Sequence, residues 1–558
     1  MRVALSRGQR LIFLTAKTLG QRIAVDTIRA MQQGLFRSLQ LRAKAKMCAN
    51  AEIICHEEYC PYAKDYGLKL VRSQLLRNLI NDDAHQDPDR IYHAAVQHEL
   101  CPFEVSLDLL SEIDVLVCDY NYVFDPDIGL AAILNQGALR DAVLVIDEAH
   151  NLVDRSREYY SPAISSQLLE RARTLLDTRD SAAFRDLRVL VGELADLVAE
   201  VVAGALGPDR VGDAIVELPA DRIADLRLAF DGALLSYFVY KREHDLWMAD
   251  DPIVEVFLAL MRLHRALSEG GSEFVHLASR TADGTASVKV CCLDASRFVG
   301  RVLEESAGVV AMSATLEPFE FYRELLGFSP HRTDELYVPS PFPASNRLVL
   351  CIPDVDTTFR RRAAHYDRIA DWIARLAHPD HNVLTLFPSY RFLDAVRDRL
   401  PPVGHRLLVQ EPSSSDAVQS SFLDALASNE RHLVLAVLGG IFAEGVDYPG
   451  EMLSQVIVVS PGLPQLSTER ELLKAYYQEF YGHGFGYAYL VPGLTRVVQA
   501  AGRIFRSADD RGVIVLMCQR FQDPRYARLL PSEWTDDDPS SLLREDPAAE
   551  VRRFFDQF

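Results

Sequence analysis

Residues 142–150 read AVLVIDEAH, a short apolar run that ends in two adjacent carboxylates. The run predicts a buried strand, from whose carboxyl end Asp147 and Glu148 emerge. Open α/β sheets bind ligands at that edge. Asp147 is suited to hold Mg²⁺ through water, and Glu148 to orient and deprotonate an attacking water. The alternative is a plain helix N-terminus, where acidic residues favour the helix dipole.

Apolar runs of this kind recur along the chain in two groups. They lie at 11–15, 115–118, 142–146 and 308–312, and then at 347–352, 382–387, 433–438, 455–459 and 513–517. Stretches with helical spacing, such as 18–33 and 390–400, separate them. This alternation is typical of parallel sheets covered on both faces, so the sequence predicts two α/β domains.

Two segments interrupt the first group of strands. Residues 160–285 have the spacing of amphipathic helices, and about 41–104 are rich in cysteine. We therefore expect a first α/β domain at 1–40, 105–160 and 286–335, a cysteine-rich insertion at 41–104, a helical insertion at 161–285 and a second α/β domain at 336–558.

Five of the nine cysteines fall within the first 118 residues. Cys118 lies inside an apolar run and reads as core, which leaves Cys48, Cys55, Cys60 and Cys101. Their spacing lacks the tight pairs of zinc modules and suits an iron–sulfur cluster. A zinc site and a set of ordinary buried thiols remain alternatives.

Polar residues also follow other predicted strands. Gln499, Arg503 and Arg506 would share one face if 499–506 is a helix, and two guanidinium groups suit a triphosphate. The alternative is a solvated basic face. Further candidate ligand-binding residues follow strands or precede these arginines, and the evidence for each one alone is weak. They are Ser313, Thr315, Glu444, Gly445, Asp447 and Gly502.

The bulk composition is that of a soluble globular chain. Hydrophobic residues make up 49%, and no stretch reaches the roughly 20 apolar residues of a membrane span. The apolar run at 11–16 is too short for a secretion signal, so we expect a cytoplasmic protein. The net charge of −20 argues only weakly against nucleic acid, because a local basic channel can lie on an acidic body.

In this order the segments resemble the XPD/DinG group of superfamily 2 iron–sulfur DNA helicases, from about residue 11 to 534. The matching stretches are LIFLTAKTLGQRIAVDTIR, KAKMC, CPYAKDYGLK, CPFEVSLDLLSEIDVLVCDYNYVFDP, AVLVIDEAHN, VVAMSATL, NVLTLFPSY, LGGIFAEGVDYPG, QAAGRIFRS and LPSEW.

The resemblance implies two RecA-like motor domains, with an iron–sulfur insertion at 41–104 and an arch domain at 161–285. It implies ATP and Mg²⁺ as ligands, a four-iron, four-sulfur cluster, and 5′-to-3′ movement on single-stranded and forked DNA in repair or replication. His150 belongs to the matching DEAH sequence. Tyr120 and Tyr122 are candidates for stacking on bases, or else core residues beside a strand.

One expected element is missing from the sequence. The family places a phosphate-binding loop, G-x-x-x-x-G-K-S/T, before the segment at 11–29, and no such pattern occurs in residues 1–558. We therefore expect this chain alone to hydrolyse ATP poorly or not at all. Two other interpretations are a non-catalytic nucleic-acid-binding remnant of a helicase, and a structural adaptor whose cysteines bind zinc.

Overall fold

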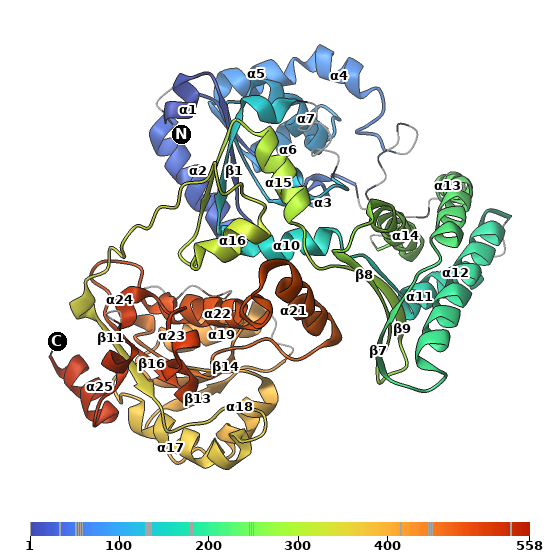
Figure 1. Ribbon diagram of the computed structural model, residues 1–558. Coiled ribbons are helices and arrows are strands. Elements are labelled where there is room, and N and C mark those ends of the chain that lie inside the picture. Colours follow the sequence, from blue (N-terminus) through green and yellow to red (C-terminus); the bar gives the residue numbers. More distant parts are fainter. Residues whose placement is uncertain are drawn as a thin grey trace. The chain divides into compact units, whose positions relative to one another are not determined.

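The computed structural model describes the chain apart from residues 1, 33–34, 51–52, 54, 56, 58–59, 129–136, 179–181, 245, 247, 249, 413–415, 445, 447, 449, 536–537 and 558. It divides into two compact units (Figure 1). Unit 1 comprises Met1–Leu316 and Glu320–Thr333, and unit 2 comprises Glu317–Phe319 and Asp334–Phe558. Among the described helices, none is long and apolar enough to cross a membrane.

Unit 1 is built on sheet A, whose strands are all parallel and follow the order β10-β5-β1-β4-β2-β3. The strands are β1 (Arg10–Leu14), β2 (Ser38–Gln40), β3 (His85–Gln86), β4 (Val115–Cys118), β5 (Ala142–Asp147) and β10 (Gly308–Met312). The four strands predicted for the first domain are therefore confirmed. β3 lies within the segment predicted as a cysteine-rich insertion, so that segment also contributes to the sheet.

Helix α2 (Thr18–Gln32) covers one face of sheet A. Ala24, Val25 and Ile28 of this helix pack against Leu11, Val115 and Val117 of strands β1 and β4. These contacts use the apolar stripe that the sequence spacing of 18–33 predicts.

Helix α2 covers this face of sheet A less completely towards β10. Val117, Phe13, Val145 and Val310 are successive neighbours across the sheet on this face. Val117 is fully buried, Phe13 and Val145 are half-buried, and Val310 is 52% exposed. Met312, which follows Val310 on the same face, is 39% exposed. Parallel sheets normally bury both faces, so this edge carries uncovered apolar surface.

The cysteine-rich segment folds into short helices beside sheet A. They are α3 (Lys44–Met47), α4 (Tyr66–Ser73), α5 (Leu75–Asp82), α6 (Pro88–Gln97) and α7 (Pro102–Asp108). Asp87 caps α6 by accepting hydrogen bonds from the backbone N–H groups of Asp89 and Arg90. Outside residues 161–285, the described part of unit 1 and its border with unit 2 also contain α1 (Arg2–Ser6), α8 (Asn121–Phe124), α10 (Leu152–Tyr159), α15 (Ser296–Glu305) and α16 (Phe319–Leu325).

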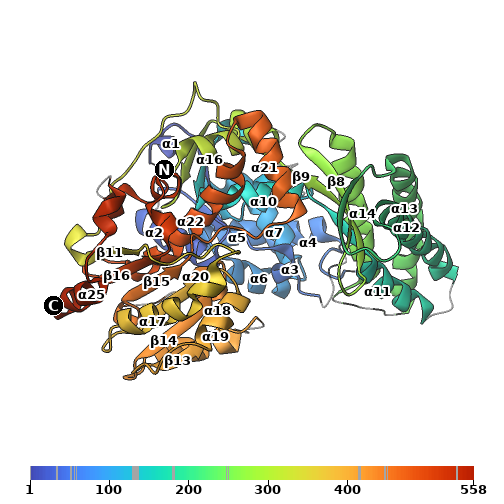
Figure 2. The same ribbon diagram turned by 60° about the horizontal axis from the view of Figure 1, so that its bottom comes forward.

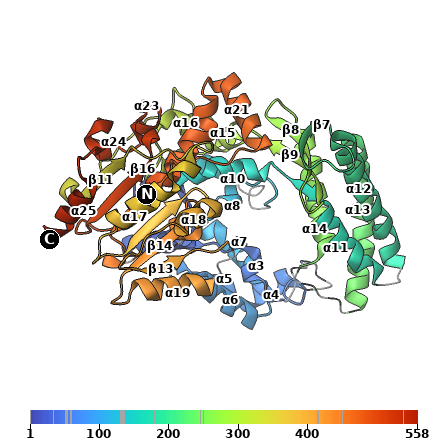
Figure 3. The ribbon, with the colours of Figure 1, turned by 90° about the horizontal axis from the view of Figure 1, so that it is seen from below.

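The segment predicted as helical, 161–285, contains the expected helices and also most of a sheet, one strand of which (Ala286–Cys292) lies in the part predicted for the first α/β domain. The helices are α11 (Ser166–Asp177), α12 (Ala182–Leu206), α13 (Ala220–Glu243) and α14 (Pro252–Glu269). Sheet B is antiparallel in the order β6-β9-β8-β7, formed by β6 (Ala163–Ser165), β7 (Gly212–Val216), β8 (Phe274–Arg280) and β9 (Ala286–Cys292). Figure 2 shows these helices beside β8 and β9, and Figure 3 shows them beside β7, β8 and β9.

Unit 2 is built on sheet C, which is also parallel, in the order β11-β16-β15-β12-β14-β13. The strands are β11 (Arg347–Ile352), β12 (Val383–Phe387), β13 (Arg406–Val409), β14 (His432–Val437), β15 (Gln455–Val459) and β16 (Gly512–Met517). Every residue of β12, β14, β15 and β16 is buried, and hydrophobic clusters cover both faces. All five strands predicted for the second domain are confirmed.

The helices of unit 2 complete this parallel α/β layer structure. They are α17 (Tyr366–Leu376), α18 (Tyr390–Arg397), α19 (Asp416–Leu426), α20 (Ile441–Glu444), α21 (Thr468–Tyr481), α22 (Val491–Ala501), α23 (Pro524–Ala527), α24 (Ser532–Thr535) and α25 (Pro547–Asp556). Both units thus have the mixed α/β architecture with parallel sheets that the sequence predicts for RecA-like domains.

Candidate functional site

The first candidate site lies at the carboxyl ends of β1, β5 and β10 in unit 1. These neighbouring parallel strands end at the same edge of sheet A, so the residues that follow them come together. Asp147 ends β5 and Glu148 follows it, while Ser313 follows β10. The structure therefore brings together Asp147, Glu148 and Ser313 as the sequence predicts.

The turn after β5 has an unusual backbone. Glu148 has a φ of 51°, in the left-handed region that side chains other than glycine rarely adopt. The hydroxyl of Tyr120 donates to the backbone oxygens of Asp147 and Glu148, the latter at 3.0 Å, and so holds this turn in place. Strained backbone of this kind persists only where the surroundings fix it, and it concentrates at functional sites.

A hydrogen-bonded network joins the residues after β5 to those after β10. Ser313 Oγ donates to Glu148 Oε2 at 3.2 Å and lies 2.7 Å from His150 Nδ1. A serine hydroxyl has one hydrogen, so its bond to Glu148 leaves Oγ as the acceptor for an N–H of His150. The backbone N–H of Thr315, a buried residue, also donates to Ser313 Oγ at 3.2 Å.

Burial sets the protonation of this network. Burial is the largest cause that raises the pKa of Asp147, and the negative charge of the neighbouring Glu148 raises it further. Burial lowers the pKa of His150. The negative charge of Glu148 raises it, but by less than burial lowers it. His150 is therefore neutral at pH 7, which suits its role as a hydrogen-bond donor to Ser313.

Two residues of this edge were not singled out in the sequence. Lys17 Nζ lies 3.7 Å from Glu148 Oε1, and a Cβ added at Gly20 would lie 2.6 Å from Thr15 Oγ1 and 3.4 Å from Asp147 Oδ2. The available signal was the position of Thr15 and Lys17 directly after the β1 strand, which parallels β5. Because it has no side chain, Gly20 lets α2 approach Thr15 and the Asp147 carboxylate closely.

Tyr120 and Tyr122 are core residues, which is the second of the two roles that the sequence left open for them. Tyr120 is fully buried and Tyr122 is 5% exposed, so neither ring presents a face to a base. Their hydroxyls instead donate to backbone oxygens, that of Tyr122 to Arg42 at 3.2 Å.

The second group of candidate residues lies in unit 2. Arg503 Nη1 donates to the backbone oxygen of Val446 at 2.8 Å, which joins the segments around 446 and 503. The α-helix expected over 499–506 ends at Ala501, so Gln499, Arg503 and Arg506 do not share a helix face.

The chain leaves the helix here for two physical reasons. Gly502 has a low helix propensity, and Ile504 and Phe505 turn inward, where they are 4% and 9% exposed. Glu444 ends α20, whereas Gly445 and Asp447 lie outside the described residues.

The four cysteines expected to bind a cluster line one cavity. Cys48, Cys55, Cys60 and Cys101 all contribute to the wall of a cavity of about 270 Å³ between α3 and α7. Among the described residues, no three His, Cys, Asp or Glu side chains are gathered closely enough to hold a single metal ion. The donor set and its shared cavity fit a group bound by four thiolates.

Polar groups around this cavity point at the sulfur atoms. Asn50 Nδ2 donates to Cys60 Sγ at 3.0 Å. Burial lowers the pKa of Lys44, but the hydrogen bond to Cys55 and the charges of Cys55, Glu104 and Cys101 together raise it above its ordinary value. Burial raises the pKa values of Cys48 and Cys101.

The other five cysteines are core residues, as predicted from their place in apolar runs. Each is at most 1% exposed; they are Cys118, Cys291, Cys292, Cys351 and Cys518.

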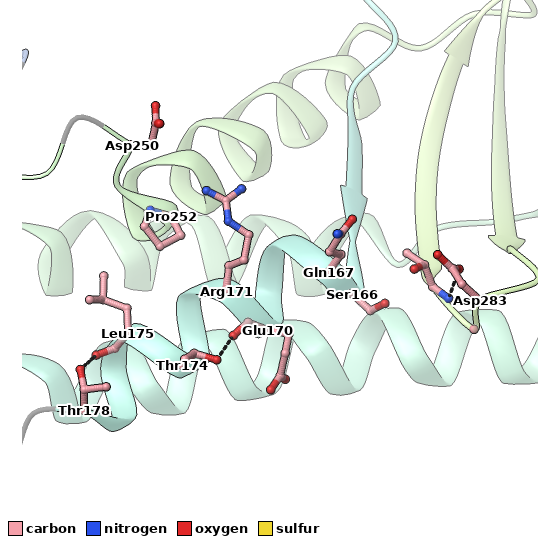
Figure 4. A pocket seen from close by; sticks show the side chains of 12 residues that line it. Ser166, Gln167, Glu170, Arg171, Thr174, Leu175, Thr178, Asp250, Pro252 and Asp283 are labelled. Atoms are coloured by element: carbon pink, nitrogen blue, oxygen red, sulfur yellow. Dashed lines mark hydrogen bonds between the residues drawn. The ribbon is translucent and has the colours of Figure 1, made fainter. Parts of the chain in front are cut away.

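A larger cavity, of about 870 Å³, opens between α11, the start of α14 and the β8–β9 turn. Figure 4 shows that some of its polar residues, Thr174, Thr178 and Asp283, already form hydrogen bonds within their own elements. Thr174 Oγ1 donates to the Glu170 oxygen at 2.9 Å, Thr178 Oγ1 to the Leu175 oxygen at 2.7 Å, and Asp283 accepts from Thr285 N at 3.0 Å. These groups are satisfied without a ligand.

Comparison with known proteins matches both halves of the chain to helicase families. The family described as DEAD_2 matches residues 31–169, and the family described as Helicase C-terminal domain matches residues 373–537. Together they span more than half of the chain.

Curated relatives are similar at low identity. An ATP-dependent DNA helicase DinG of Photobacterium profundum is 24% identical over 79% of this chain and 72% of its own length. An ATP-dependent DNA helicase XPD of Sulfolobus acidocaldarius is 22% identical over 76% of this chain and 73% of its own. For the Saccharomyces cerevisiae ATP-dependent DNA helicase CHL1 the identity is 22%, and this chain spans 61% of that protein.

Solved structures agree on the fold. A structure titled XPD_Helicase matches with a TM-score of 0.58 and 19% identity over 94% of both chains. One titled Structure of S. tokodaii Xpd4 matches with a TM-score of 0.52 and 18% identity over 94% of both. With two parallel RecA-like sheets and both helicase families matched in order, the chain belongs to the XPD/DinG-like superfamily 2 helicases.

Proposed function

We propose that this chain provides the motor of a DNA helicase that uses ATP to move 5′ to 3′ along single-stranded DNA, in repair or replication. The observation that carries the proposal is the network at the carboxyl edge of sheet A. Asp147, Glu148, His150 and Ser313 converge there from two parallel strands. Helicase relatives of similar sequence support the same reaction class.

Each residue of this edge has a role that follows from its position. Asp147 is the ligand for Mg²⁺, which when bound neutralises developing phosphate charge. Glu148 orients the attacking water and accepts its proton. Ser313 holds the Glu148 carboxylate and is itself positioned by His150, and Ser313 transmits changes at the nucleotide to β10. Arg503 and Arg506 supply positive charge for the transition state of the same reaction.

The phosphate cradle is the element that these residues do not provide. No G-x-x-x-x-G-K-S/T pattern occurs in residues 1–558. We propose that a strand–loop–helix element carrying this loop pairs with the outer edge of β10, and that its helix covers Val310 and Met312. The exposure of these two side chains, at 52% and 39%, supports the proposal, because edges of parallel sheets are otherwise covered.

Hydrogen exchange gives a structural test that does not depend on turnover. A peptide or fused segment with the phosphate loop should protect the backbone amides of β10 and leave those of β13, the outer strand of sheet C, unchanged. If β10 exchanges at the same rate with and without the segment, the pairing proposal is wrong.

We further propose that Cys48, Cys55, Cys60 and Cys101 hold a four-iron, four-sulfur cluster. Their common cavity and the chemistry of four thiols support it. These residues would bind it from the end of α3, from Cys55 and Cys60, and from the start of α7. The chain's own residues supply the thiolates and, from Asn50, a hydrogen bond to Cys60 Sγ.

Metal analysis of protein purified without oxygen tests this assignment. The protein should be brown and contain about four iron and four sulfide per chain. Cys48→Ala, Cys60→Ala and Cys101→Ala should each lose the iron, whereas Cys118→Ala, at a buried β4 position, should retain it. Stoichiometric zinc without iron would identify a structural zinc site instead.

A further inference from the structure

The turn after β11 in unit 2 places an exposed aromatic ring among arginines. The sequence here is TTFRRR, residues 357–362. Phe359 is 80% exposed, which is unusual for a phenylalanine. Arg360 and Arg361 are exposed beside it, and the guanidinium carbon of Arg362 lies 4.6 Å from the centroid of the Phe359 ring.

The base of this turn is held rigidly. Asp356 Oδ1 accepts from the backbone N–H of Thr358 at 2.9 Å, and the Thr358 oxygen accepts from Arg361 and Arg362 N–H at 3.0 and 2.8 Å. Thr357 Oγ1 accepts from Arg520 Nη2 at 2.8 Å and is buried. Phe359 is therefore presented on a fixed backbone rather than on a long mobile loop, which lowers the entropic cost of binding.

The neighbouring helix extends the basic surface. The Arg362 guanidinium carbon also lies 5.7 Å from the centroid of Phe392 in α18. Arg391, next to Phe392, is exposed near the start of this helix. Within the described part of the chain, Arg360, Arg362 and Arg391 form no ion pair with a carboxylate. They therefore remain available to an anion, on a chain whose net charge is −20.

We propose that Phe359, Arg360, Arg362 and Arg391 form a binding subsite for single-stranded nucleic acid, in which one base stacks on Phe359 and the arginines bind the flanking phosphates. The proposal rests on the DNA-helicase function proposed above and names residues for its substrate. An aromatic face bordered by guanidinium groups is the pairing that sequence-independent single-strand binders use. A duplex has its base faces stacked inside, so it cannot use the ring.

The subsite lies at the carboxyl edge of sheet C. Residue 359 follows the carboxyl end of β11, and α18 begins after the carboxyl end of β12. Arg406 provides a matched control, because it opens β13 at the amino edge of the same sheet. It is 71% exposed and paired with Glu430.

Fluorescence anisotropy of a labelled oligothymidylate with the full 558-residue chain tests the subsite. Phe359→Ala should weaken binding on the order of 5- to 150-fold, and Phe359→Tyr should restore it. Arg362→Ala should weaken binding and reduce the slope of log affinity against log salt by about 0.7. Arg406→Ala should bind as the unchanged chain does. The melting temperature of Phe359→Ala should not change, because the side chain is exposed.

Three outcomes would overturn the subsite. The first is that the original chain binds the oligonucleotide and that Phe359→Ala and Arg362→Ala both bind it with the same affinity. This result would not contradict the proposed helicase function. The second is equal loss of duplex and single-strand binding in Phe359→Ala. The third is displacement of the oligonucleotide by polyglutamate, if the affinity for polyglutamate falls in Phe359→Ala. That result would show that the surface binds an acidic peptide. Failure of the unchanged chain to bind the oligonucleotide would instead contradict the proposed function, and the subsite with it.

Discussion

The two parallel sheets of this chain are closed to different degrees. In sheet C the strands β12, β14, β15 and β16 are buried at every position. In sheet A the burial of β5 alternates between buried and half-buried residues, and the outer strand β10 exposes Val310 and Met312. Sheet C is thus buried throughout these inner strands and exposes Leu407, at 41%, on its outer strand β13, whereas sheet A is open along its β10 edge and already only half-covered at the inner strand β5. That open edge adjoins the Asp147–Glu148 turn, which links an uncovered surface to an incomplete site.

The largest effect is expected for the groups that act on ATP. In a form supplied with a phosphate-loop element, Glu148→Gln or Arg506→Ala should reduce DNA-stimulated turnover by about a thousandfold or more, because phosphoryl transfer depends on placed charge. Steady-state phosphate release measures this. Arg553→Ala, at an exposed arginine of α25, is the control and should leave turnover unchanged. Turnover within tenfold of the unchanged protein in either active-site variant would remove that residue from the reaction.

Two methionines compare the outer strand β10 of sheet A with the inner strand β16 of sheet C. Met312 ends β10 and is 39% exposed, whereas Met517 ends β16 and is fully buried. Met517→Ala should lower the free energy of unfolding of unit 2 by about 2–5 kcal/mol. Met312→Ala should change that of unit 1 by less than about 0.5 kcal/mol. Denaturant unfolding followed separately for each unit measures both, and equal losses would show that β10 is covered in solution.

The pH dependence of unit 1 should reflect His150. Its pKa is lower in the folded chain than its unfolded value because the side chain is buried. Between those two pKa values the unfolded state binds more protons, so stability is present above the unfolded value of about 6.5 and falls as pH decreases below it. The loss approaches about 1.4 kcal/mol per pH unit.

His150→Gln removes this titration and should flatten the slope below about pH 6.5. Asp147, whose pKa is raised, contributes with the opposite sign, since its stabilising proton is lost as pH rises. Denaturant unfolding of unit 1 at a series of pH values tests the difference between the two proteins. The same slope in both would place the titration elsewhere.

The smallest effect concerns Tyr120. Tyr120→Phe removes the hydroxyl that donates to the backbone oxygens of Asp147 and Glu148, and should cost about 0.5–1.5 kcal/mol. Oligonucleotide affinity should not change, because the ring is fully buried. A parallel loss of affinity in Tyr120→Phe would restore a DNA-contact role to this residue.

The sequence predicts β1, β4, β5 and β10 of sheet A and β11, β12, β14, β15 and β16 of sheet C, because buried parallel strands are continuous apolar runs. It misses the short strands β2 and β3 and the partly exposed outer strand β13. It does not predict sheet B in the same way. Strand β7 alternates exposed and half-buried residues, so it has no continuous apolar run. A search for apolar runs therefore does not distinguish it from the amphipathic helices around it.

The site is predicted as far as it depends on strand ends. Asp147, Glu148 and Ser313 follow parallel strands, so their meeting could be inferred before their contacts were known. The network through His150, the Lys17–Glu148 pair and the burial of Tyr120 depend on side chains up to 165 residues apart. Local pattern carries no information about such long-range packing, and the end of α22 at Ala501 is likewise set by the inward turn of Ile504 and Phe505.

ATP hydrolysis with and without a phosphate-loop element tests the central claim most directly. Residues 1–558 alone, saturated with single-stranded DNA, should show turnover near the background of the Glu148→Gln variant. The same chain supplied with a strand–loop–helix element carrying G-x-x-x-x-G-K-S/T should show DNA-stimulated turnover, and replacement of the loop lysine should abolish it. Robust DNA-stimulated turnover by residues 1–558 alone, abolished by Glu148→Gln, would contradict the account, because the phosphates would then be held by another segment of this chain.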